Sequence, residues 1–497
     1  MNPSAAADRR TDPAAGPEGG PPHVVVVGGG IAGLAAAAFL TGAAGGGGPR
    51  ARVTVLEASA RFGGKLRPGE VGGVAVDLGA ESMLARRPEA VDLARDVGLA
   101  DAMEPPATAR AAVWTRGALR PLPTGHVMGV PGDLEALERS GVLSPEGLER
   151  VRQDLVLPPT EVGDDVSIGD WVAARVGREV VDRLVEPLLG GVYAGHADRI
   201  SLRAAVPQLL PLARSGGSLV EGVRALQQRA AAAAPAVPPP VFQGIAGGVG
   251  RLPGAVADAA RAAGAELRPG TEVRALRRTP HGWRLAVRDA DGEHGLDADA
   301  VVLAVPAPAA ARLLAAEEPA AAAELAAVEY AGMALVTLAF DRAAMPAGLT
   351  GSGFLVPPVD GRAIKASTFS TNKWGWLDRS APDRFLLRTS VGRHGEDAEL
   401  GLPDEELVAR SLAALREAVG LEAVPYATEV TRWQGGLPQY PVGHPDRVRR
   451  IRERAARHGT LALCGAAYDG VGIPACVASA RQAADAVAGA LAAAAAR

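Results

Sequence analysis

The N-terminal part of the chain carries two short apolar runs on either side of a helical pattern. An apolar run at 23–27 ends in three consecutive glycines, and an Ala- and Leu-rich stretch follows at 31–40. A second apolar run covers 53–56 and ends in Glu57. Runs of this length predict strands, and the stretch between them has the composition of a helix. The segment 23–57 is therefore predicted to be one βαβ unit.

The pattern changes to helical periodicity with charged faces between about 88 and 213. The clearest stretch is 170–189, and proline pairs at 105–106 and 158–159 interrupt the series. These features predict an inserted helical region. Residues 229–240, alanines that close on three prolines, have the composition of a linker.

The second half of the chain returns to strand patterns. After a helical stretch that ends near 263, runs at 272–276, 283–288 and 301–305 are interpreted as strands that return to the first domain. Runs at 333–340, 352–356, 363–370 and 385–391 predict a mostly antiparallel sheet, with a helix at 405–419. A last strand is expected at 460–464, and Pro474 opens a terminal helix.

Composition narrows the classes of function. The chain has 497 residues, a formal net charge of −4 and few aromatic residues, which argues against a nucleic-acid-binding surface. Only Cys464 and Cys476 are present, so no disulfide framework and no metal site is expected, and a reducing cytoplasm is the natural setting.

Neither terminus has the pattern of a membrane segment. Residues 1–22 lack the apolar core of a signal peptide and are interpreted as a disordered tail. The Ala-rich C-terminus contains Arg481 and Asp485, which favours a soluble helix over a membrane span. Peripheral membrane contact by another surface stays open.

The glycines Gly28, Gly30 and Gly33 have the spacing of a dinucleotide-binding turn between a strand and a helix. Backbone N–H groups and the helix dipole can hold a diphosphate there. Glu57, after the second strand, is placed to accept hydrogen bonds from ribose hydroxyls. The alternatives are a ligand-free tight turn and a solvated carboxylate.

Further motifs resemble a known superfamily. Arg61, Gly63, Gly64 and Lys65 precede the sequence Asp-Leu-Gly-Ala at 77–80, and a second glycine-rich motif covers 465–474. This series is similar to that of the flavin-dependent amine oxidases and protoporphyrinogen oxidases. The resemblance implies a discontinuous, Rossmann-like FAD-binding domain of the glutathione-reductase type, within a chain of mixed α/β and α+β class.

The resemblance also implies where FAD binds. The implied residues are Gly28, Gly30, Ile31, Ala32, Gly33, Glu57, Ala58, Arg61, Gly64, Lys65, Gly79, Ala80, Val273, Ala304, Gly465, Val471, Gly472 and Ile473. Val273 and Ala304 would otherwise be interpreted as strand core. No Cys stands at 435–438, where amine oxidases commonly link their flavin covalently, so a noncovalent FAD is expected.

Rarer segments narrow the resemblance. Five segments resemble those of bacterial porphyrinogen oxidases, at 82–88, 186–195, 431–433, 437–440 and 442–444. Within that group, the chain resembles the type from Gram-positive bacteria most. That type implies oxidation of coproporphyrinogen III to coproporphyrin III in haem biosynthesis, with three O2 reduced to three H2O2 and transient contact with a ferrochelatase-type enzyme. Protoporphyrinogen IX oxidation, amine oxidation and a non-catalytic FAD-binding module are the alternatives.

The expected domains follow from these patterns. A tail at 1–22 precedes an FAD-binding domain at 23–87, 241–318 and 441–497; a helical insertion covers 88–228, a linker 229–240, and a substrate domain 319–440.

The expected chemistry needs positioning more than acid–base groups, because hydride loss from a porphyrinogen bridge leaves a cation that the pyrroles delocalise. No catalytic side chain is assigned, since flavin N5 takes the hydride. Substrate carboxylates call for cations, first Arg86 and Arg87, then Lys365, Lys373 and Arg388. Eukaryotic relatives have an Arg soon after the Asp-Leu-Gly turn, where this chain has Glu81. A side chain that binds a substrate carboxylate is therefore not expected at this position.

Apolar wall and proton acceptors complete the expected site. Leu188, Val192, Tyr193, Phe354, Leu355 and Phe369 are candidates for the wall, with core packing as the alternative. His126, His196 and His444 are candidate proton acceptors, although a lone His is more often structural.

Overall fold

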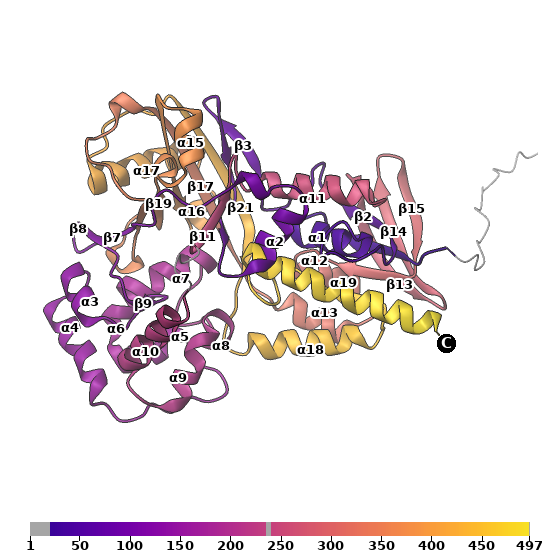
Figure 1. The fold of residues 1–497 in the computed structure, drawn as a ribbon, viewed down its shortest axis with the longest axis horizontal. Coiled ribbons are helices and arrows are strands. Elements are labelled where there is room, and N and C mark those ends of the chain that lie inside the picture. The colour runs from indigo at the N-terminus through magenta and orange to yellow at the C-terminus, as the bar shows by residue number, and fades with distance from the viewer. Residues whose placement is uncertain (1–19, 235–239, 497) are drawn as a thin grey trace, which may run out of the picture.

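The computed structural model describes residues 20–234 and 240–496. Most of the expected tail at 1–22, and residues 235–239 of the expected linker, therefore lie outside the described residues. Figure 1 shows two parts, a parallel sheet with its helices at the right and a second sheet above a group of helices at the left.

The right-hand part contains a five-stranded parallel sheet built from three distant segments of the chain. Its order is β12 (Glu266–Pro269), β2 (Arg52–Glu57), β1 (His23–Val27), β16 (Ala300–Leu303) and β22 (Leu461–Leu463). The valines of β1 are buried because a parallel sheet is covered on both faces. The expected discontinuous, Rossmann-like arrangement is confirmed.

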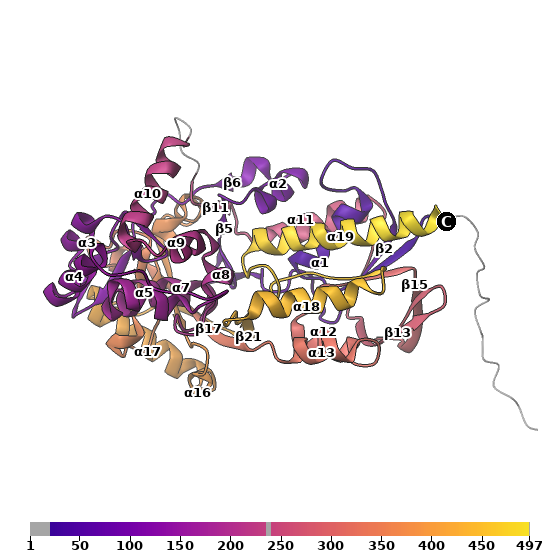
Figure 2. The same cartoon turned by 90° about the horizontal axis from the view of Figure 1, so that it is seen from below.

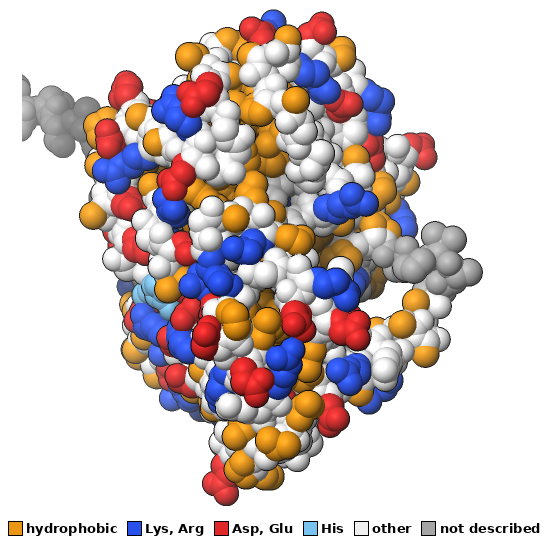
Figure 3. Space-filling view, turned by 90° about the vertical axis from the view of Figure 1, so that its left-hand side faces the viewer, with side chains coloured by type: hydrophobic (Ala, Val, Ile, Leu, Met, Phe, Trp, Pro, Cys, Tyr) orange, Lys and Arg blue, Asp and Glu red, His pale blue; other side chains and the backbone are white. Residues whose placement is uncertain are grey.

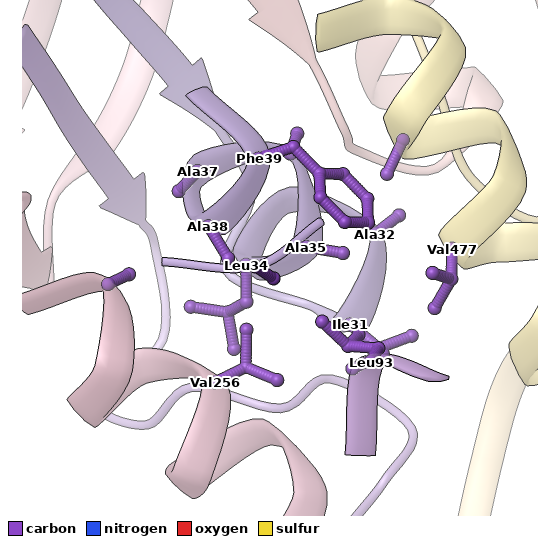
Figure 4. Packing of buried hydrophobic residues seen from close by; sticks show 14 of the residues in the cluster. Ile31, Ala32, Leu34, Ala35, Ala37, Ala38, Phe39, Leu93, Val256 and Val477 are labelled. Atoms are coloured by element: carbon purple, nitrogen blue, oxygen red, sulfur yellow. The ribbon is translucent and has the colours of Figure 1, made fainter. Parts of the chain in front are cut away.

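Three helices cover one face of this sheet, α1 (Ile31–Thr41), α11 (Arg251–Ala262) and α19 (Ile473–Ala495). Every residue of α1 is buried, and its alanines allow α19 to pack closely against it. Figure 4 shows Leu34 of α1 pointing towards Val256 of α11, with Val477 of α19 on another side of the helix.

The opposite face carries a separate antiparallel sheet. Its strands are β13 (Glu272–Thr279), β14 (Gly282–Asp289) and β15 (Gly292–Ala298). The runs at 272–276 and 283–288 are strands, as expected, and they pack against the parallel sheet as a separate layer without joining it. Their alternating pattern buries Trp283 and Leu285 against the sheet and leaves the other side in solvent, as suits a covering layer.

The left-hand sheet has seven strands. Their order is β21 (Ala427–Pro438), β17 (Tyr330–Asp341), β20 (Arg384–Val391), β19 (Ala366–Thr368), β18 (Gly353–Leu355), β7 (Ala112–Thr115) and β8 (Ala118–Pro121). All neighbours are antiparallel except β18 and β7. The mostly antiparallel sheet is confirmed, with α17 (Asp404–Val419) against it.

The span 88–228 is not helical throughout, because β7 and β8 form a hairpin within it. Arg116 and Gly117 adopt positive φ angles of 52° and 73° at its turn, as a tight hairpin requires. Apolar Val113 and Trp114 are buried where the hairpin extends the large sheet. The domain bounds themselves stay a prediction.

Helix α2 (Pro88–Asp96) packs against α19 in the parallel-sheet part. The remaining helices of this span lie below the large sheet in Figure 1. They are α3 (Leu134–Ser140), α4 (Pro145–Arg152), α5 (Ile168–Val176), α6 (Arg178–Val180), a π-helical turn (Val181–Val185), α7 (Glu186–Tyr193), α8 (Leu202–Ala205), α9 (Leu210–Ser215) and α10 (Leu219–Ala232). Gly177, at φ 94°, interrupts the helix expected at 170–189. Helix α10 extends into the expected linker, as Figure 2 shows at its upper left.

Short elements connect these parts. They include β3 (Pro68–Val71), β4 (Val74–Asp77), β5 (Met83–Leu84), β6 (Met103–Glu104), β11 (Phe242–Ile245), α12 (Ala307–Leu314), α13 (Pro319–Ala326), α14 (Ser370–Lys373), α15 (Gly375–Ser380), α16 (Asp397–Leu400) and α18 (His444–Ala456). Across the described ranges, no helix has both the length and the apolar character that a bilayer crossing needs.

Candidate functional site

A cavity of about 440 Å³ opens at the carboxyl ends of the parallel strands. The first glycine turn contributes Gly28 and Gly30, and the second contributes Gly465 and Val471. The chain ends of β1, β2 and β16 complete the floor with Val27, Leu56 and Ala304. Two turns more than 400 residues apart in sequence thus face one cavity, in the size range of small-molecule sites.

The three glycines of the first turn have different roles. A Cβ on Gly28 would lie 2.6 Å from the Ala304 oxygen, and one on Gly33 would lie 1.8 Å from the Gly28 oxygen. A Cβ on Gly30 would meet no atom within 4 Å. Gly28 and Gly33 are thus needed for the turn itself, whereas the space at Gly30 belongs to the cavity. This arrangement suits a diphosphate held against the backbone.

Glu57 is fixed in position at the edge of the cavity. Its two carboxylate oxygens accept hydrogen bonds from the backbone N–H of Gly29 at 2.7 Å and of Ser59 at 2.8 Å. The side chain is therefore oriented by the first turn and is not a freely solvated carboxylate. Its remaining lone pairs are available to ligand hydroxyls.

Positive charge gathers on the cavity. Lys65 lines it and is half-buried, and burial lowers the pKa of its ammonium group. Within the described ranges no carboxylate lies at ion-pair distance from Lys65. Helices α1 and α19 both begin at the cavity, at Ile31 and Ile473, and their N-terminal ends are positive. An anionic ligand is therefore favoured.

Most residues assigned to FAD from the sequence line this cavity. They are Gly28, Gly30, Ile31, Ala32, Glu57, Ala58, Gly64, Lys65, Ala80, Val273, Ala304, Gly465, Val471 and Ile473. Gly33, Arg61, Gly79 and Gly472 do not line it. Gly33 and Gly79 instead allow close backbone packing, since a Cβ on Gly79 would lie 2.0 Å from the Lys65 oxygen. Arg61 is exposed and donates to the Gly64 oxygen at 2.6 Å.

The cavity is also lined by residues that were not assigned individually from the sequence. They are Thr271, Glu272, Pro306, Ala309, Arg312, Leu313, Tyr330, Ala466, Ala467 and Cys476, besides strand ends. Cys476 follows Ile473 by three residues on α19, so helical periodicity would have placed both on one face. Tyr330 comes from the other sheet, and no local signal indicates it.

Two of the expected substrate cations are engaged with a buried carboxylate. Glu81 lies 2.6 Å from Lys373 and 3.2 Å from Arg388, and Arg388 also donates to the Gly79 oxygen at 2.8 Å. Burial acts to raise the pKa of Glu81, but Arg388 and Lys373 hold it below its usual range. Lys373 and Arg388 are therefore not free cations at a rim, because Glu81 neutralises them.

Lys365 is also not at a rim. It is buried in the large-sheet domain and donates to the Gly392 oxygen at 2.9 Å. Burial, with Arg393 nearby, lowers the pKa of Lys365 to about 7. A lysine at the end of a strand gives no local signal of burial, which is why the sequence suggested an exposed cation.

Arg86 and Arg87 differ from each other. Arg87 pairs with Glu89 at 2.6 Å, whereas Arg86 is exposed and makes no hydrogen bond or ion pair within the described parts of the chain. Arg86 follows β5, where Leu84 pairs with Phe242 of β11, and both of these side chains are exposed. Of the five cations expected to bind substrate carboxylates, Arg86 is thus the one most available to a ligand.

The expected apolar wall divides into two groups. Phe354 and Phe369 pack in the core of the large-sheet domain, with ring centroids 6.0 Å apart. Leu355 instead faces α7, where a Cβ on Gly191 would lie 3.9 Å from it, and Val192 of α7 is 42% exposed. On the face drawn in Figure 3, hydrophobic side chains gather along the middle, with Arg and Lys side chains on both sides.

None of the three candidate histidines lines the cavity. His126 accepts from the Gly129 backbone at 3.0 Å within a turn, and His196 lies 3.2 Å from Glu186. His444 is buried and stacks on Tyr440, with ring centroids 4.1 Å apart. Each has a structural contact in the described fold.

Comparison with known proteins identifies the family. The model of the flavin containing amine oxidoreductases matches residues 31–488. The chain belongs to this family. Flavin is therefore its cofactor class, and the cavity fits such a group through its open space at Gly30 and through Lys65, which no carboxylate of the described residues pairs with.

Three similar proteins stand out. The coproporphyrinogen III oxidase of Bacillus subtilis is 32% identical over 428 residues, which cover 86% of this chain and 89% of that one. The protein of the same name from Mycobacterium tuberculosis is 37% identical over 442 residues, or 87% and 90% of the two chains. A crystal structure from Exiguobacterium sp. 255-15, whose name provisionally assigns it to the protoporphyrinogen oxidases, matches with a TM-score of 0.81 and 33% identity over 94% of this chain and 98% of that one.

Proposed function

We propose that this protein oxidises coproporphyrinogen III to coproporphyrin III with a noncovalent FAD and O2 as the electron acceptor. The cavity shared by the two glycine turns carries the flavin part of this proposal. The choice of substrate is supported by the two relatives that bear the name coproporphyrinogen III oxidase.

A bound FAD would supply the chemistry of hydride acceptance from the methylene bridges and of electron transfer to O2, which over three rounds would balance the loss of six hydrogens with three H2O2. The chain itself supplies binding and orientation. Gly30 leaves room for the diphosphate, Glu57 offers its carboxylate to ribose hydroxyls, and Lys65 with the N-terminal ends of α1 and α19 compensates negative charge.

A noncovalent flavin agrees with the state of the nearest thiol. Cys476 lines the cavity, and burial raises the pKa of its thiol to about 11. The thiolate is the reactive form of cysteine, so at neutral pH Cys476 is a poor nucleophile towards the flavin. Acid precipitation of the holoenzyme should release all of the yellow colour into the supernatant.

The substrate side offers an apolar surface with few free charges. Leu355 of β18 lies near Gly191 of α7, the neighbouring Val192 is exposed, and Arg86 is exposed and has no ion-pair partner within the described residues. A flat apolar macrocycle with carboxylates at its rim suits this combination.

Anaerobic flavin reduction tests the proposal. The purified holoenzyme is mixed in a stopped-flow instrument with coproporphyrinogen III, protoporphyrinogen IX or putrescine, and flavin bleaching is followed. We expect coproporphyrinogen III to reduce the flavin with the highest rate constant per unit concentration. Preference for protoporphyrinogen IX would favour the function that the Exiguobacterium protein's name suggests. Reduction by putrescine alone, or by none of the three, would overturn the proposal.

The setting of the enzyme is part of the same proposal. We place it in the cytoplasm, where Cys464 and Cys476 stay as the free thiols that the structure shows. There it would deliver a hydrophobic product to a metal-inserting enzyme of the ferrochelatase type, either directly or at a membrane surface.

A further inference from the structure

Tyr440 occupies a position between the two halves of the site. It follows β21 and is only 1% exposed. Its hydroxyl donates to the Ala466 oxygen at 2.5 Å and accepts from the Gly470 backbone N–H at 2.8 Å. Ala466 lines the cofactor cavity, and the segment 465–471 forms the second glycine turn. The phenol oxygen of Tyr440 is therefore hydrogen-bonded to both the start and the end of the loop that leads into α19.

The other contacts of Tyr440 reach the substrate side. Its ring lies 5.5 Å from that of Tyr193, the last residue of α7, and the side-chain amide of Gln439 donates to the Tyr193 oxygen at 2.7 Å. The backbone carbonyl of Tyr440 accepts a hydrogen bond from the Ser201 N–H at 2.9 Å. Helix α7 also carries Gly191, whose Cβ position lies 3.9 Å from Leu355, and the exposed Val192. A displacement of α7 would thus change the contacts of Tyr440 directly.

His444 holds the other side of the Tyr440 ring. The two rings are stacked, 4.1 Å between centroids and 14° between planes. His444 is 1% exposed, and within residues 20–234 and 240–496 neither ring nitrogen makes a hydrogen bond. Its contact with Tyr440 is therefore made through the flat face of the ring.

We propose that Tyr440 is a positioning residue, which fixes the cofactor loop 465–471 through its hydroxyl and couples that loop to α7, with His444 as its stacking support. The proposal rests on the proposed FAD site. Trp433 on β21 itself makes an analogous contact, since its indole N–H donates to the Leu78 oxygen at 3.0 Å, near the cavity-lining Ala80. Strand β21 and the residues that follow it thus contact both loops that flank the cavity.

Removal of the Tyr440 hydroxyl tests the proposal. Tyr440→Phe keeps the buried ring but leaves the Ala466 oxygen and the Gly470 N–H without their partner. The matched control is Tyr426→Phe, because the exposed Tyr426 hydroxyl donates only to the Gly72 oxygen at 3.3 Å. FAD affinity is measured by titrating each apoprotein with FAD and following the quenching of flavin fluorescence.

We expect Tyr440→Phe to weaken FAD binding about tenfold, the effect of one buried hydroxyl that serves two partners, and Tyr426→Phe to leave it unchanged. The visible absorption maxima of the bound flavin should shift in Tyr440→Phe only. In anaerobic reduction by coproporphyrinogen III, the limiting rate should fall more than the substrate's apparent affinity, because the loop and not the substrate contact is altered.

His444→Ala provides the second variant. Loss of the stacked ring should weaken FAD binding in the same direction and shift the same absorption bands, even if Tyr440→Phe proves too unstable to purify. Unchanged FAD affinity and an unchanged spectrum in the variants that fold would overturn this inference. Wild-type protein that fails to bind FAD would instead refute the proposed function.

Discussion

The ammonium group of Lys373 lies 2.6 Å from the carboxylate of Glu81, and 292 residues of chain separate the two. Arg388 approaches the same carboxylate at 3.2 Å. The side chain of Glu81 is 8% exposed, and those of its partners are 17% and 14% exposed. The cluster therefore joins the loop after β4 to α14 and β20 of the large sheet, next to the cavity-lining Ala80.

Glu81→Gln should destabilise the protein by about 3 kcal/mol, because two buried cations would lose their counter-charge. Urea denaturation of the apoprotein measures this loss. Glu104→Gln is the control, since Glu104 pairs at 2.6 Å with Arg379, whose side chain is 66% exposed and screened by water. Equal effects of the two substitutions would contradict the assigned role of Glu81.

The same cluster shows where sequence reasoning ends. Gly28, Gly30, Gly33 and Glu57 could be assigned because their roles depend on a local order of strand, turn and helix. The pairing of Lys373 and Arg388 with Glu81 depends on how distant segments meet, and no local pattern encodes it. Each cation, considered alone, therefore looked available to substrate.

Alanine substitutions at two glycines of the first turn should affect different properties, FAD binding at Gly30 and folding stability at Gly33. Gly30→Ala should fold with an almost unchanged melting temperature, because Gly30 has φ −72° and its Cβ would meet no protein atom within 4 Å. FAD binding should nevertheless weaken by about tenfold or more, since the methyl group would occupy the space left for the diphosphate.

Gly33→Ala should instead destabilise the apoprotein itself, by about 1–3 kcal/mol or more, because its Cβ would lie 1.8 Å from the Gly28 oxygen. Thermal unfolding and FAD titration of both variants separate the two effects. Normal FAD affinity in Gly30→Ala would show that the open space at Gly30 does not hold the cofactor.

Arg86 is predicted to contact a substrate carboxylate. Arg86→Ala should raise the KM for coproporphyrinogen III about fivefold, as expected for one partly exposed charge contact, and should raise that for protoporphyrinogen IX less. Arg95→Ala is the control, because Arg95 is exposed on α2 and already pairs with Asp92. An equal change for both porphyrinogens would count against a carboxylate contact.

The large sheet illustrates a second limit of the sequence. Its central strands were predictable because β17 and β20 are long apolar runs. The hairpin β7–β8 was missed because its strands are four residues each and its pairing with β18 lies more than 200 residues away in sequence. Tyr330 escaped assignment to the cavity for the same reason, as it enters from the other sheet.

Acid stability provides a test of the environment of His444. Burial, with Arg447 nearby, lowers the pKa of His444 from 6.5 to about 4. Since its folded-state pKa is depressed, His444 contributes stability that is present above pH 6.5 and is lost as the pH falls towards 4. Between these values the unfolded chain binds a proton that the folded chain does not, so the loss reaches about 3 kcal/mol.

His444→Phe keeps a flat ring against Tyr440 and removes the titrating group. Urea denaturation between pH 6.5 and 4 should show a shallower pH dependence of the free energy of unfolding in this variant than in the wild type. Parallel curves for the two proteins would mean that His444 becomes protonated in the folded state as readily as in water.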